Sequence, residues 1–321
     1  MIERCRFIAG FGVIFALFIS VCARADEASL VTALQDTYMS CIGIDDELYE
    51  LKKMAGINTA ITGVGTGLGI GATAVGIAKE KVDQKIDTLK LDKLRKIEEQ
   101  RTEIGAPEMS NEDKDKFSTD FNAGAGSGDV GVQDTEITRL TNKSKSLGHW
   151  RTGLMVGNTA TNVAGAIISS QNRVGADLQT QIDNCKASVS RLQDVMMQAK
   201  MEGLDINEAQ SIVNACKEYN YVDLEKINER GKGATISSVV GAGLGLTGTI
   251  TSGIANSNAI RSQTTAQGLR TDKEKNLNTA SNVLAGASTI ASATATVFNA
   301  TQIKAIKDVA NVASKCTGVL K

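Results

Sequence analysis

The chain has 321 residues, and its 35 Lys and Arg nearly balance 36 Asp and Glu, which gives a formal net charge of −1. This balance offers no basic surface for nucleic acid, so we expect no nucleic-acid partner. Aromatic residues make up 4% of the chain and Pro107 is its one proline, which argues against a thick conventional core and favours long uninterrupted helices.

Residues 1–25 have the layout of a secretory signal peptide. A basic start precedes an apolar run at 7–21, and Ala23 and Ala25 form an A-x-A cleavage site. The alternatives are a retained membrane anchor, for which the apolar run is short, and lipidation at Cys22. We therefore expect a protein that is exported to the periplasm, the cell envelope or the medium, with membrane association as an alternative.

A first helical-hairpin unit is predicted over 26–203. Cys41 is the first part of the pattern that this unit contains, and a glycine segment with VGTGLG at 64–69 follows it. A Gly-Ala-Pro helix stop then begins a glycine-rich stretch at 105–133, which indicates a flexible tip connector and a contact surface for a partner. The returning arm carries NTATNV at 158–163.

The end of the returning arm has the spacing of a coiled-coil seam. Its apolar residues step by three or four positions: Val174, Leu178, Ile182, Cys185, Val189, Leu192 and Met196. This pattern puts Cys185 at a core position. A break at Gly203 ends the unit, and Asp205 and Glu208 indicate the cap of a new helix.

A second unit, predicted over 204–321, repeats the order of the first. Cys216 precedes VGAGLG at 240–245, and NTASNV at 278–283 precedes Cys316. Repetition of this order indicates an internal duplication. We therefore predict an all-α, internally duplicated fold of long antiparallel helical hairpins.

Four of the six cysteines lie after the expected cleavage site: Cys41, Cys185, Cys216 and Cys316. An even number of cysteines in an exported chain favours disulfides, and spacing alone allows three connectivities. If Cys216 pairs with Cys316, the turn of the second hairpin falls in the polar stretch 261–270, and Gly241 lies opposite Ala291. Small residues then face small residues, as a close-packed hairpin requires.

The same geometry applies to the first unit. If Cys41 pairs with Cys185, the turn falls in the tip connector and Gly65 lies opposite Thr161. We therefore favour one disulfide within each unit over the other connectivities.

The glycine segments resemble glycine zippers of membrane and envelope proteins, a motif that identifies no family. Glycines four residues apart form a stripe along which a partner backbone can approach closely. Each glycine costs about 1 kcal/mol in a helix relative to alanine, so close packing must recover this loss. We expect Gly243→Leu to disrupt the second hairpin by overpacking. The expected helix-packing residues are Gly63, Gly65, Gly67, Gly69, Gly71, Gly241, Gly243, Gly245 and Gly248.

Four uncharged runs are long enough to cross a bilayer. In the hairpin register Trp150 and Arg151 lie near the level of Lys79, which resembles anchoring at a membrane interface. Many Asn, Ser and Thr residues make each run only marginally apolar, so insertion would follow assembly of a bundle. The runs are 54–78, 152–172, 233–260 and 276–303.

No motif in the chain predicts catalysis. A G-x-G-x-x-G pattern at 243–248 lacks the acidic residue that a dinucleotide site needs about 20 positions later. His149 is the only histidine, and three aspartates at 113–120 lack the other ligands of a calcium loop. We expect no enzyme, no cofactor and no metal.

These features predict an exported, non-enzymatic structural or interaction protein that self-associates or contacts a membrane or envelope protein. The alternative is a membrane-inserting or pore-forming protein that uses the four uncharged helices.

Overall fold

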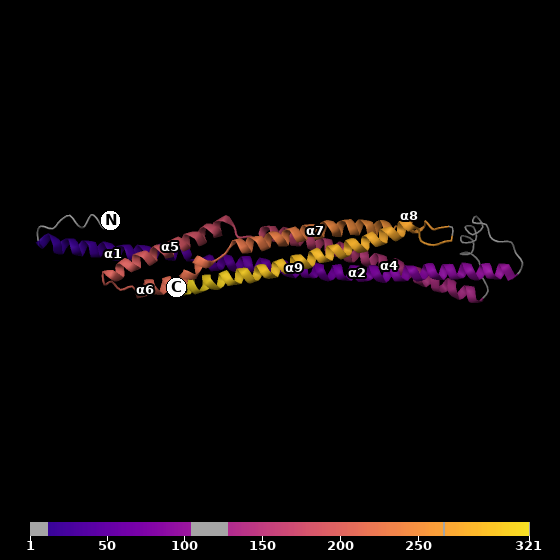
Figure 1. Cartoon of the computed structure of the whole chain (residues 1–321), viewed down its shortest axis with the longest axis horizontal. Coiled ribbons are helices and arrows are strands. Elements are labelled where there is room, and N and C mark those ends of the chain that lie inside the picture. The colour runs from indigo at the N-terminus through magenta and orange to yellow at the C-terminus, as the bar shows by residue number, and fades with distance from the viewer. Residues whose placement is uncertain (1–11, 104–127, 266, 321) are drawn as a thin grey trace. The chain divides into compact units, whose positions relative to one another are not determined.

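The computed structural model describes residues 12–103, 128–265 and 267–320, and every regular element in these ranges is helical (Figure 1). The predicted all-α class is therefore confirmed. The start of the expected signal peptide and most of the connector, 104–127, lie outside the described residues. Residues 128–133, which we expected in the connector, begin a helix instead.

The structure has the following helices in chain order. They are α1 (Gly12–Cys41), α2 (Ile44–Glu103), α4 (Gly128–Gln171), α5 (Ala176–Met201), α6 (Asn207–Cys216), the 3-10 helix η2 (Lys217–Tyr221), α7 (Glu225–Asn256), α8 (Asn258–Arg261) and α9 (Asp272–Leu320). Gly43 and Gly203 take the left-handed φ values of +87° and +80° at the ends of α1 and α5, a conformation that glycine adopts without strain.

The chain forms two compact units, and neither corresponds to a sequential half. Unit 1 comprises 1–56, 172–231 and 300–321, whereas unit 2 comprises 57–171 and 232–299. Each unit therefore takes residues from both predicted hairpins, 26–203 and 204–321. The internal duplication stays a prediction.

Unit 1 has a conventional apolar core. The stripe at 174–196 that the sequence predicts is buried, as are Ile306, Val309 and Ala313 of α9. Two disulfides, Cys41–Cys185 and Cys216–Cys316, lie in this core. They are the pairs that the hairpin geometry favours.

Unit 2 is built from parts of α2, α4, α7 and α9 and from the short helix α8 (Figure 1). The contacts between α2 and α4 follow the register expected from the first disulfide, because a Cβ on Gly65 would meet the side chain of Thr161. The contacts between α7 and α9 follow the register expected from the second disulfide, because a Cβ on Gly248 would lie 3.1 Å from the Cβ of Leu284. The expected turn at 261–270 begins at the last residue of α8, ends before α9 and contains an isolated bridge from Thr264 to Arg270.

Candidate functional site

The interior of unit 2 is a polar seam. On each of its four helices the buried residues recur every three or four positions, as in a coiled coil, but they are mainly Gly, Ala, Ser, Thr and Asn. Only a few apolar side chains larger than alanine, such as Met155, are buried there. The seam includes Asn58, Thr62, Gly65, Gly69, Asn158, Asn162, Ser169, Ser238, Gly241, Gly245, Ser281, Ser288, Ser292 and Asn299.

Hydrogen bonds cross this seam between helices. The amide of Asn58 donates to Ser169 Oγ (2.5 Å) and to Asn299 Oδ1 (2.9 Å). The amide of Asn158 donates to Ser288 Oγ (3.0 Å), and that of Asn162 donates to Ser292 Oγ (2.8 Å). Most polar groups of the seam therefore find partners inside the bundle rather than in solvent.

Large apolar side chains lie on the outside of the same four helices. On α9, Val283, Ile290 and Val297 are seven residues apart and 65%, 70% and 61% exposed. The other outward-facing residues of the uncharged segments are Ile57, Val64, Ile70, Ile77, Val156, Val163, Ile167, Ile236, Val239, Val240, Leu246, Ile250 and Ile254. Unit 2 thus has its polar side chains inside and its apolar side chains outside, the reverse of unit 1.

Three helices among the described residues are long and apolar enough to cross a membrane, judged by length and composition. They are contained in Glu27–Gln100, Glu225–Asn256 and Asp272–Leu320. In each, only 28% of the most apolar window is buried. The apolar surface that would face lipid is therefore exposed.

The predicted helix-packing glycines divide into two groups. Gly65, Gly69, Gly241, Gly245 and Gly248 lie in the seam, where a Cβ would meet a neighbouring side chain. In most of these positions the neighbour is Asn, Ser or Thr, for example Asn162 at 3.0 Å from the Cβ position of Gly241. These glycines make room for hydrogen-bonding side chains.

The other glycines lie outside the tight contacts. A Cβ on Gly71 would make an ordinary contact with Leu154 at 3.4 Å. A Cβ on Gly63, Gly67 or Gly243 would have no neighbour within 4 Å. Our expectation that Gly243 is closely packed is therefore wrong, because this residue lies on the open face of α7.

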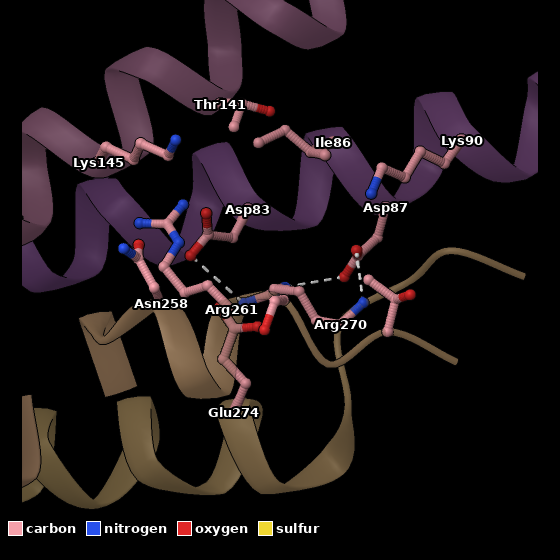
Figure 2. Close-up of a pocket in the computed structure, with 12 residues that line it drawn as sticks. Asp83, Ile86, Asp87, Lys90, Thr141, Lys145, Asn258, Arg261, Arg270 and Glu274 are labelled. Atoms are coloured by element: carbon pink, nitrogen blue, oxygen red, sulfur yellow. Dashed lines mark hydrogen bonds and ion pairs between the residues drawn. The ribbon is translucent and has the colours of Figure 1, made fainter. Parts of the chain in front are cut away.

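A network of charged residues caps unit 2 beyond the uncharged segments. Lys79 Nζ lies 2.7 Å from Asp83 Oδ2, and both side chains are at most 3% exposed. Asp83 also accepts a hydrogen bond from Ser144. Arg270 pairs with Asp83 (3.4 Å) and with Asp87 (3.0 Å), as Figure 2 shows.

Asp83, Asp87 and Arg270 of this network line a pocket of about 340 Å³, together with Lys90 and Glu274 (Figure 2). Burial lowers the pKa of Lys90, and burial raises the pKa of Glu274, on which the positive charge of Lys79 acts in the opposite direction. For Arg270, burial opposes the charged form, but the hydrogen bonds that Arg270 donates to Glu80 and the charges of the nearby carboxylates raise its pKa overall. The charged residues of the network therefore lie outside the uncharged segments and away from their exposed apolar side chains.

The three residues expected to anchor the chain at a membrane interface differ in position. Trp150 is 68% exposed, as an interfacial anchor requires. Arg151 and Lys79 are buried inside unit 2, so our expectation that they reach toward the interface is wrong for the folded chain. Sequence spacing put them at one level of the bundle but could not show that their side chains point inward.

The chain was compared with protein-family models, with curated protein sequences and with solved structures, and no match was found.

Proposed function

We propose that the chain is an exported, non-enzymatic protein of the cell envelope whose unit 2 inserts into a lipid bilayer as a four-helix bundle. The observation that carries this proposal is the direction of the side chains: large Val and Ile side chains point outward, and Asn and Ser side chains point inward. In water an amphipathic helix buries its apolar face. In a bilayer, small and polar residues line the contacts between helices and apolar residues face lipid.

The lengths of the uncharged segments support the proposal, and for α4, which is not among the three helices apolar enough to cross a membrane, length is the only support. Within unit 2 they are 57–78, 152–171, 233–260 and 276–299. At 1.5 Å per residue each reaches the thickness of about 30 Å of a bilayer's hydrocarbon core. The charged cap lies beyond these segments and would stay in the polar region.

The hydrogen bonds of the seam lower the cost of burying polar groups in lipid. A single helix with Asn158 and Asn162 would expose both amides to hydrocarbon. In the bundle each amide donates to a serine of α9. We therefore infer that the four helices assemble before or while they insert, and we assign no enzymatic activity, cofactor or nucleic-acid partner to them.

The exposed apolar face also favours a second candidate function, self-association in the envelope. Val283, Ile290 and Val297 form one line along α9 that a second copy could cover. Exposed apolar patches of this kind indicate either a membrane or a protein partner.

A substitution on this face tests insertion. We expect the purified protein to resist carbonate extraction, to float with liposomes and to release an entrapped dye. Ile290→Lys should abolish flotation and dye release, because a lysine near the bilayer centre costs about 3 kcal/mol. The matched control is Met201→Lys, which changes an 81% exposed residue of unit 1 and should behave as the wild type.

Complete carbonate extraction, together with no flotation of the wild type, would contradict insertion. If Ile290→Lys then reduces the oligomer size in solution, measured by light scattering, the exposed face is a contact between copies instead.

A further inference from the structure

A buried arginine in unit 2 has no hydrogen-bond partner. Arg151 of α4 is 0% exposed, and none of its three guanidinium nitrogens donates a hydrogen bond within the described residues. A buried charge without a counter-charge is costly, and native proteins pair such groups. Burial lowers the pKa of Arg151 to about 10, with Glu80 acting in the opposite direction, so the side chain stays charged at neutral pH.

The nearby carboxylates are already paired with other cations. Glu80 directs one oxygen to Arg270 Nη1 (3.2 Å) and the other to Arg270 Nη2 (3.3 Å). Asp83 accepts from Lys79 Nζ at 2.7 Å. Arg151 is therefore left without a carboxylate of its own, although Glu80 acts on it electrostatically.

The surroundings of Arg151 include further groups without partners. A Cβ on Gly76 would lie 3.0 Å from Arg151 Nε and would also meet Asn282 Oδ1, an atom without a hydrogen bond. One turn along α2, Lys79 Nζ donates to Asn278 Oδ1 (3.3 Å), and the Nδ2 of Asn278 has no acceptor. Unpaired donors thus outnumber unpaired acceptors in this part of unit 2, which calls for an acceptor with negative charge.

We propose that the guanidinium of Arg151 binds a small monovalent inorganic anion, of the size class of chloride, inside unit 2, with the Asn278 amide as a second donor. The anion must be small because neighbouring helices enclose Arg151 completely. It must be monovalent because one positive charge lacks a counter-ion. This site does not depend on insertion into a membrane, so it goes beyond the proposed function.

Thermal unfolding of the full exported chain tests the site. Chloride replaces gluconate from about 1 to about 300 mM at constant ionic strength, so that only the identity of the anion changes. A ligand that binds the folded state alone stabilises it, and we expect the Tm to rise by about 5 °C once chloride is far above its Kd. Bromide should act in the same way.

Arg151→Gln should remove this dependence on chloride. Arg139→Gln is the matched control, because Arg139 lies on the same helix with a side chain that is 62% exposed, and it should keep the dependence. A wild-type Tm that does not change with chloride, or an equal shift in Arg151→Gln, would overturn the proposal.

A second measurement covers the case in which Arg151→Gln does not fold. Binding should broaden the chloride-35 NMR signal in the presence of the wild type, and bromide but not gluconate should reverse the broadening. Absence of such broadening at all chloride concentrations contradicts the site whatever the variant does.

Discussion

The buried glycines of unit 2 make room for hydrogen-bonding side chains more than they bring helix backbones into contact. Gly245 leaves room for Thr159 Oγ1 and Ser288 Oγ, which would lie 2.5 and 3.1 Å from a Cβ at that position. Ser288 Oγ in turn donates to the carbonyl of Gly241 (2.7 Å). The loss of helix propensity at each glycine is therefore offset by polar contacts that a larger residue would block.

Two glycines of α7 provide a direct test of this view. Gly248→Leu should destabilise the fold by about 1 to 3 kcal/mol, because its side chain would collide with Met155 and Leu284. Gly243→Leu should instead be neutral or stabilising by up to about 1 kcal/mol, since its position is open and leucine favours helix. Chemical denaturation of both variants measures the difference.

Equal destabilisation by the two substitutions would show that another molecule covers the open face of α7 in solution. The sequence marked both glycines as packing residues because they share one apolar segment. Only the position of α4 and α9 around α7 distinguishes them.

At the scale of the element, the buried residues of the helices recur with the same spacing in both units, but they are mainly apolar in unit 1 and mainly small or polar in unit 2. In α5 the buried positions are mainly apolar, such as Leu178, Ile182 and Leu192. In α4 the positions with the same spacing include Asn158, Asn162 and Ser169. Period alone therefore fixes which residues share a face, whereas composition decides what that face can pack against.

The polar seam should be essential for the bundle in unit 2. Asn162→Ala removes a donor to Ser292 and to Asn158 and leaves the buried Ser292 Oγ without the donor of its accepted hydrogen bond, so we expect a loss of about 1 to 3 kcal/mol of stability. The neighbouring Val163→Ala, at a 46% exposed position, should change stability in water by less than about 0.5 kcal/mol. Denaturation in aqueous buffer compares them.

A larger effect of Val163→Ala than of Asn162→Ala would mean that the buried face of α4 is the apolar one. The sequence placed these residues side by side in one uncharged segment, and either face could have been turned inward.

At the scale of the whole molecule, both disulfides belong to unit 1. They join residues 144 and 100 positions apart, and loops of this length contribute about 4 to 5 kcal/mol each in the chain-entropy model. No described residue of unit 2 takes part in a disulfide. Covalent stabilisation is therefore concentrated in the unit with the apolar core.

Reduction of the disulfides should accordingly affect the units differently. We expect hydrogen exchange to increase strongly in 176–201 and 207–221 of unit 1, and much less in 152–171 and 233–256 of unit 2. Mass spectrometry of exchanged peptides, with and without a thiol reductant, measures this contrast. Equal loss of protection in both units would show that unit 2 depends on the disulfides, and mapped bonds that join Cys41 to Cys216 or Cys316 would contradict the pairing itself.

The sequence by itself determined the helical class, and it favoured the register of the paired arms and the cysteine pairs that the structure has. These follow from local periodicity and from the symmetry of each hairpin, because an antiparallel turn sets which residues lie opposite each other. The pairing of Gly65 with Thr161 is an example, since its prediction needed only the positions of two cysteines and a turn.

Only the tertiary structure decided which face of each helix is buried and how the hairpins divide into units. Residues 57–78 present both a polar and an apolar stripe, and the sequence gives each stripe the same period. The choice depends on the other three helices, whose Asn and Ser side chains accept and donate hydrogen bonds across the seam. The inward position of Arg151 has the same origin, because a side chain becomes buried only when neighbouring helices surround it.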